Sequence, residues 1–180
     1  RALASLGDSP GSNPFARHVA RGRVHNVVVM LLESWSASYV DAFRRGPPLQ
    51  VTPEMDHLAR DGLRFDEFYA AGQRSYEGLQ AALTGLPALP GVPTLTEGLM
   101  MRTTRLGALA ERNGMRTIFV QASKRRSLRL DSVAQALGFS EYYGREDVAR
   151  VLLAYPDAEA FRFGLDHESM QLLADKLHGE

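Results

Sequence analysis

The sequence contains no cysteine and no excess of charge of either sign. Without cysteine, the chain can form neither a disulfide nor a thiolate metal site, although this leaves its compartment open. Lys plus Arg and Asp plus Glu number 21 each. A chain with this balance has no overall field to attract nucleic acid, so we expect no nucleic-acid partner.

Long apolar runs, repeats and low-complexity tracts are also missing. No run approaches the roughly 20 apolar residues that cross a bilayer, and no signal peptide is visible, so these 180 residues are expected to be soluble. What is present fits a globular domain: 180 residues with 44% hydrophobic content are enough for one sizeable core.

Residues 1–23 are rich in Gly, Ser, Pro and Arg and are expected to form a linker into the domain. Arg17, Arg21 and Arg23 within it either form a solvated face or meet anionic lipid headgroups. The chain begins at Arg1 rather than Met, so we expect an excised or processed piece of a longer protein.

A continuous apolar run ends abruptly in a carboxylate near the start of the domain. It reads Asn-Val-Val-Val-Met-Leu-Leu-Glu-Ser-Trp over residues 26–35. The pattern predicts a buried parallel strand that delivers Glu33 to its C-terminal end, the edge where open α/β sheets bind ligands. A charge beside so apolar a run needs a partner, which a cation would supply. Alternatively, Glu33 caps a following helix.

A second stretch runs from aromatic, extended residues through a polar turn into an Ala/Leu-rich helix over residues 65–85. It predicts Ser75 at or near the first helical position. A hydroxyl there lies among unpaired backbone N–H groups at the positive end of the helix dipole, which favours an alkoxide or a bound phosphate. Ser75 is therefore a candidate nucleophile, and the alternative is a plain N-cap.

The other elements are predicted from caps, apolar periodicity and Gly or Pro stops. The expected helices cover 36–45, Pro53 to the Gly62 stop with Thr52 as N-cap, 103 or 104 to 113, 131–137, 146–153 and 168–177. A strand is expected over 115–120, and residues 63–69 and 138–143 are expected to be strands or extended loops.

The strand over 115–120 is expected to deliver residues 121–126 to the same sheet edge as Glu33 and Ser75. This segment holds Lys124 and two arginines. Arg is well matched to phosphate oxygens, so the segment either contacts an anionic headgroup or forms a solvated loop.

Together these stretches resemble the alkaline phosphatase superfamily, in particular its sulfatase-like branch of lipoteichoic acid synthases and phosphoglycerol transferases. The matching pieces arrive in the family's order over about residues 24–178. They are residues 26–34, Thr52-Pro53, 58–62, 65–69, 72–78, 83–87, 114–117 and 164–169. The resemblance implies an α/β fold with a mostly parallel sheet flanked by helices.

The resemblance also implies a mechanism and a set of site residues. Glu33 and Ser75 would bind a divalent metal, manganese or magnesium before zinc, and Ser75 would be the nucleophile of a covalent phospho-enzyme. Arg129, Arg74 and Lys124 would contact the anionic phospholipid headgroup, and a glycan or polyol would accept the phosphoglycerol. Such enzymes act outside the cytoplasm, in the periplasm or cell envelope, behind membrane helices.

Two departures qualify this picture. Family members show a His-Gly-Asp-like turn and then a Trp and an Arg after the strand over 115–120, whereas this chain has Gln121-Ala122-Ser123 and offers only Arg129. The segment 75–79 lacks the Pro and Arg that formylglycine sulfatases require, which argues against sulfate esters. A phosphodiesterase of the same superfamily and a non-catalytic α/β binding domain are the alternatives.

Asp166-His167 resembles the family's Asp-His metal pair but is expected to start a helix, with Asp166 as its cap. The true pair would then lie beyond Glu180, and residues 24–180 would be the N-terminal half of the catalytic domain. One carboxylate and one hydroxyl make a weak metal site, so we expect this chain to be inactive alone. Its unpaired surface, where the missing half packs, would be a route to oligomers.

Overall fold

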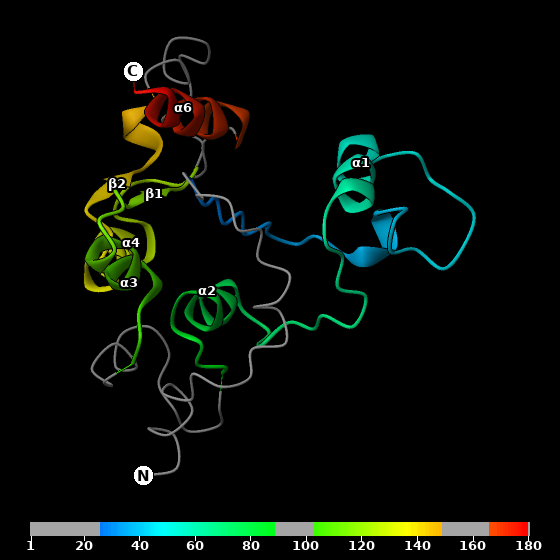
Figure 1. The fold of residues 1–180 in the computed structure, drawn as a ribbon, viewed down its shortest axis with the longest axis horizontal. Coiled ribbons are helices and arrows are strands. Elements are labelled where there is room, and N and C mark those ends of the chain that lie inside the picture. Colours follow the sequence, from blue (N-terminus) through cyan, green and yellow to red (C-terminus); the bar gives the residue numbers. More distant parts are fainter. Residues whose placement is uncertain (1–25, 89–102, 149–165, 180) are drawn as a thin grey trace.

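A computed structural model describes residues 26–88, 103–148 and 166–179. It confirms the predicted α/β class: helices surround a small parallel sheet (Figure 1). The expected linker over 1–23 lies outside the described residues, as does most of the helix expected over 146–153. No helix in the described ranges is long and apolar enough to span a bilayer.

The sheet consists of two short parallel strands. β1 (Ile118–Val120) pairs with β2 (Glu141–Tyr143), with Phe119 opposite Tyr142. The chain between them crosses over through the 3-10 helix η4 (Ser127–Arg129) and the helix α4 (Leu130–Ala136), as a parallel connection requires. The predicted strand over 115–120 is thus confirmed at its C-terminal end, and the alternative of a strand within 138–143 is correct.

The core lies where α2 (Ser75–Thr84) and α4 pack beside β1. Leu137, which follows α4, has no exposed surface. It clusters with Leu83 of α2 and Val133 of α4, and Phe119 of β1 packs against them. This apolar cluster fixes the orientation of α2, and with it the position of Ser75.

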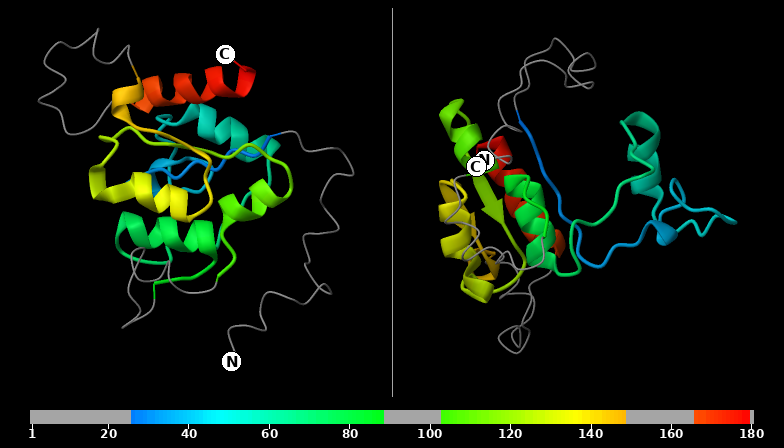
Figure 2. Two further views of the ribbon diagram at one scale, coloured as in Figure 1. Left: turned by 90° about the vertical axis from the view of Figure 1, so that its left-hand side faces the viewer. Right: turned by 90° about the horizontal axis from the view of Figure 1, so that it is seen from below.

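The other helices begin and end close to where the sequence predicts. They are α1 (Pro53–Asp61), α3 (Leu106–Arg112) and α6 (Asp166–His178). α3 touches the end of α4, where Ala108 N–H donates to the Leu137 carbonyl at 3.1 Å. α6 is attached through Leu172, which packs on the buried Val148. α1 and the turns before it form a separate lobe (Figures 1 and 2).

The prediction of a buried strand over 26–32 is wrong in this structure. Residues 26–32 contain no strand, and Val27 to Leu32 are 38–64% exposed. The extended run has no backbone partner within the described ranges. A strand is stabilised by its ladder of hydrogen bonds and its cross-strand neighbours, and apolar composition alone supplies neither.

The helix predicted over 36–45 is reduced to the 3-10 turn η2 (Ala37–Tyr39). The side chain of Ser36 caps this turn by accepting from the Ser38 N–H. Asp41 then accepts from the N–H groups of Leu49 and Gln50, at 2.7 and 2.8 Å. These hydrogen bonds fold a loop back on the turn where a helix would have continued. Residues 63–69 are likewise exposed and contain no strand.

Candidate functional site

Ser75 is the first residue of α2, as predicted. The N-cap is Arg74, so the simpler interpretation of Ser75 as the capping residue is wrong. Ser75 is exposed, and no hydrogen bond in the described ranges uses its hydroxyl or the backbone N–H groups of Ser75 and Tyr76. The hydroxyl therefore lies beside two free donors at the positive end of a ten-residue helix.

Glu77 organises the turn that leads into this helix. One oxygen of its carboxylate accepts from the N–H of Gln73 at 2.7 Å and from the N–H of Arg74 at 3.1 Å. Gly72 lies against the same side chain, and a β-carbon there would come within 2.4 Å of it. At its other end α2 stops at Gly85, whose φ of 72° suits glycine. The chain therefore leads into α2 at Ser75 through a turn whose conformation is fixed by these contacts.

Arg74 lies beside Ser75 but already has a partner. Its guanidinium donates to the Tyr76 hydroxyl at 2.6 Å and lies over the Tyr76 ring, 5.8 Å from the ring centroid. The side chain is exposed and forms no salt bridge in the described residues, although the Glu77 carboxylate nearby interacts with its charge. Its charge therefore remains available to an anion at the start of α2.

Glu33 lies at the end of the exposed apolar run. It is exposed, and its carboxylate accepts from the Ser34 hydroxyl at 3.4 Å. Ser34 has a φ of 56°, which turns the chain sharply after the carboxylate. The neighbouring residues 34–36 line a pocket of about 290 Å³ with Tyr39, Val51 and Thr52. Glu33 therefore lies directly before this sharp turn and not at the edge of a sheet.

No described hydrogen bond or shared pocket brings Glu33 and Ser75 together. Within the described ranges, no three His, Cys, Asp or Glu side chains are grouped as a metal site would require. Hard divalent cations take about six oxygen ligands, so these two residues do not by themselves fit such an ion. Their joint role at a metal remains a prediction.

The connection after β1 is held firmly against the residues that follow β2. Arg125 donates to both carboxylate oxygens of Asp147 at 2.7 Å, and this pairing raises the pKa of Arg125. The backbone N–H of Arg125 donates to Glu146 at 2.7 Å. Arg125 is therefore a structural residue, whereas Lys124, predicted to contact substrate, is exposed with no acidic partner in the described part of the chain.

Tyr142 supports the same connection from β2. Its hydroxyl donates to the Arg125 carbonyl at 2.9 Å and accepts from the Gln121 side chain. Burial raises the pKa of Tyr142 to about 12, so the phenol stays neutral and can donate this bond at neutral pH. Gln121 and Tyr142 thus fix the chain at the carboxyl end of β1.

Arg129, the third predicted substrate contact, is exposed at the N-cap of α4. Its backbone is left-handed, with a φ of 55°, and the preceding Leu128 has a φ of 52°. Two consecutive non-glycine residues in this region are uncommon and costly. The sequence carried no signal for this conformation, because neither residue is Gly, Asn or Asp.

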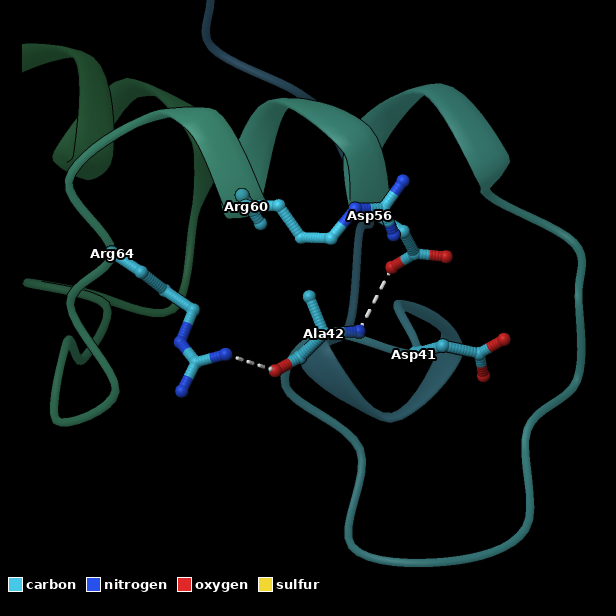
Figure 3. Close-up of a pocket in the computed structure, with 6 residues that line it drawn as sticks. Asp41, Ala42, Asp56, Arg60 and Arg64 are labelled. Carbon is cyan, nitrogen blue, oxygen red and sulfur yellow. Dashed lines mark hydrogen bonds between the residues drawn. The ribbon is translucent and has the colours of Figure 1, made fainter.

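A pocket near α1 was not predicted (Figure 3). It encloses about 380 Å³ and is lined by Asp41, Ala42, Asp56, Ala59, Arg60 and Arg64. Both acids of this pocket accept backbone hydrogen bonds that stabilise the local fold. The buried Asp56 accepts from the Ala42 N–H at 2.8 Å, and the backbone hydrogen bonds from Leu49 and Gln50 lower the pKa of Asp41.

Asp166 and His167 are the first two residues of α6, which confirms the predicted helix start, although Asp166 lies within the helix and is not its cap. His167 is exposed and lies 3.1 Å from Glu168 of the same turn. This geometry is that of a helix start.

Comparison with known proteins identifies the family. No solved structure matches the chain. A family model described as Sulfatase matches residues 25–180, which is most of the sequence. The matched range contains Glu33, Ser75 and the basic connection after β1. The chain therefore belongs to the sulfatase family, within the alkaline phosphatase-like superfamily of enzymes.

Proposed function

We propose that the protein transfers a phosphoglycerol, or a related anionic phospholipid headgroup, through a covalent intermediate on Ser75. The observation that carries this proposal is the position of Ser75: an exposed hydroxyl at the first residue of α2, beside free backbone N–H groups. Membership in the sulfatase family supports an enzyme that breaks ester bonds at phosphorus or sulfur.

A phosphodiester suits this site better than a sulfate ester. Residues 75–79 read Ser-Tyr-Glu-Gly-Leu and lack the Pro and Arg that formylglycine sulfatases require. An unmodified serine oxygen is a suitable nucleophile toward phosphorus. Arg74, whose cation lies at the same helix end, would attract the anionic substrate, with Lys124 and Arg129 as further headgroup contacts.

The proposed reaction is a double displacement. Ser75 Oγ loses its proton and bonds to phosphorus, while the bond from phosphorus to the lipid alcohol breaks and that alcohol gains a proton. The hydroxyl of a glycan or polyol acceptor then attacks phosphorus, its proton passes to Ser75 Oγ, and the serine is released. Developing charge would be stabilised by the N–H groups of Ser75 and Tyr76.

Sulfatase-like enzymes are in general metal-dependent, and we propose Glu33 and Ser75 as two ligands of manganese or magnesium. The described residues do not complete such a site, so we assign no step to the ion. Further ligands would have to come from other parts of the protein. We further propose that the enzyme works outside the cytoplasm at a membrane surface, where its lipid substrate lies.

A hydrolase of the same superfamily is the second candidate. It is favoured by the chain's Gln121-Ala122-Ser123, where headgroup transferases have a His-Gly-Asp-like turn. Product analysis separates the two, using protein expressed from its complete gene and phosphatidylglycerol with labelled glycerol. Label in an acceptor glycan supports transfer, label only in free glycerol phosphate supports hydrolysis, and full turnover by Ser75→Ala contradicts both.

A further inference from the structure

The loop of residues 124–129, between β1 and α4, presents one apolar side chain to solvent. Leu128 is 68% exposed, and its left-handed backbone, with a φ of 52°, holds it outside the helix that follows. Leucine has no polar side-chain atom to compensate this conformation, as Asn or Asp would. Other large apolar residues are as exposed as Leu128, and the outlier here is the backbone: two consecutive left-handed residues, a conformation that motivates a functional hypothesis.

Cations flank this leucine in the sequence. Lys124, Arg126 and Arg129 are all exposed, and none has an acidic partner within the described ranges. The nearby acids are occupied by the loop's own structure. Asp147 accepts from Arg125 and from the Gly144 N–H, Glu146 from the Arg125 N–H, and Asp131 from the Ser132 N–H. The loop therefore combines an exposed apolar tip with three cations that form no salt bridge in the described residues. Their charge is offset in part by the Glu146 and Asp131 carboxylates, which accept only backbone N–H hydrogen bonds.

The loop is also firmly held. The Ser127 N–H donates to the Lys124 carbonyl at 2.7 Å, and Arg125 is fixed by Asp147 on one side and by the Tyr142 hydroxyl on the other. Gly144 packs so closely that a β-carbon there would lie 2.7 Å from the Arg125 α-carbon. Because the loop is already ordered, little conformational entropy is lost when it binds a partner.

We propose that the 124–129 loop docks the protein on an anionic lipid bilayer. Leu128 enters the boundary between headgroups and acyl chains, and Lys124, Arg126 and Arg129 lie on the headgroup phosphates. Long cationic side chains reach such phosphates while their aliphatic stems remain in apolar surroundings. A bilayer fits better than a nucleic acid, since the loop's exposed tip is aliphatic and has no aromatic ring for stacking on bases.

The choice of a lipid surface rests on the proposed function, which also gives Lys124 and Arg129 to the substrate headgroup; Leu128 and Arg126 have no role there and carry the test. The test is co-sedimentation of the whole chain with two vesicle types, phosphatidylcholine alone and phosphatidylcholine mixed with phosphatidylglycerol. We expect binding to the mixed vesicles, weakened by high salt as charge attraction is screened. Leu128→Asn should weaken it about tenfold, through loss of buried apolar area, without lowering stability, since Asn tolerates the left-handed region.

Leu63→Asn is the matched control. Leu63 is 71% exposed and lies next to the α1 lobe's Arg64, but Arg64 is paired with Asp66. We expect this variant to bind vesicles like the unaltered chain, and Arg126→Gln to weaken binding severalfold.

Three results would overturn the docking: equal binding to both vesicle types, no loss in Leu128→Asn, or an equal loss in Leu63→Asn. Ser75→Ala should bind vesicles normally. If Ser75 proves not to be the nucleophile while Leu128 still controls vesicle binding, the docking stands and the proposed function fails. If Ser75 proves to be the nucleophile while Leu128→Asn does not weaken vesicle binding, the proposed function stands and the docking fails.

Discussion

Gly107 of α3 lies directly against the backbone of Leu137 at the end of α4. A β-carbon on Gly107 would lie 2.7 Å from the Leu137 carbonyl oxygen and 2.8 Å from the backbone of Gly138. The two helices can approach this closely only because Gly107 has no side chain. The contact sets α3 against the core that holds α2 and Ser75.

We predict that Gly107→Ala lowers the free energy of unfolding by about 1–3 kcal/mol, because a methyl group forced between packed backbones displaces one of the helices. Gly78→Ala is the matched control. Gly78 lies within α2 and has open space around its α-carbon, so Ala should raise stability by about 0.5–1 kcal/mol through helix propensity. Urea unfolding measures both, and changes of the same sign would contradict the packing described.

A second prediction concerns pH. Arg116 donates to both oxygens of Glu141, one bond measuring 2.8 Å, and the Tyr143 hydroxyl donates to the same carboxylate at 2.6 Å. These bonds, that of Arg116 foremost, lower the pKa of Glu141 from 4.5 to about 2. The stabilisation is therefore complete above the unfolded-state pKa and is lost as pH falls from about 5 toward 2.

The urea midpoint should accordingly fall on acidification, and Glu141→Gln should fall less steeply over the same range. Glu54→Gln serves as the control, since Glu54 is exposed in the first turn of α1 and has no ion-pair partner among the described residues. If Glu141→Gln and the unaltered chain lose stability in parallel, ionisation of the Glu141 carboxylate does not stabilise the fold.

A third prediction concerns metal. The chain of 180 residues should bind manganese, magnesium and zinc weakly, because Glu33 and Ser75 are two ligands where about six are wanted. Thermal-shift titration measures this, with Glu33→Ala as the comparison. Micromolar binding abolished by Glu33→Ala would show that this chain already carries a complete site.

The sequence predicted helices better than strands, for a physical reason. The bounds of α1 and α2 follow from signals within each segment: Pro53 at a helix start, Gly62 and Gly85 at the stops. A strand depends on a partner elsewhere in the chain. The apolar run over 26–32 shows how far composition can mislead when the structure offers no such partner.

In the candidate site too, features set by the local sequence could be predicted, whereas features that depend on distant residues could not. The position of Ser75 was predictable because an Ala/Leu-rich helix begins there. The pairing of Arg125 with Asp147 was not, because it joins residues 22 apart whose meeting depends on the sheet. The left-handed pair Leu128-Arg129 was also missed, since that backbone normally needs Gly, Asn or Asp.

The central claim is that Ser75 carries the transferred group, and peptide mass spectrometry tests it most directly. Protein expressed from its complete gene is incubated with phosphatidylglycerol, quenched in acid and cut with trypsin, which releases residues 75–102 as one peptide. We predict a glycerophosphoryl adduct on Ser75 that appears before product and is absent from Ser75→Ala. An enzyme that turns over with this peptide unmodified, or with the adduct on another residue, would contradict the account.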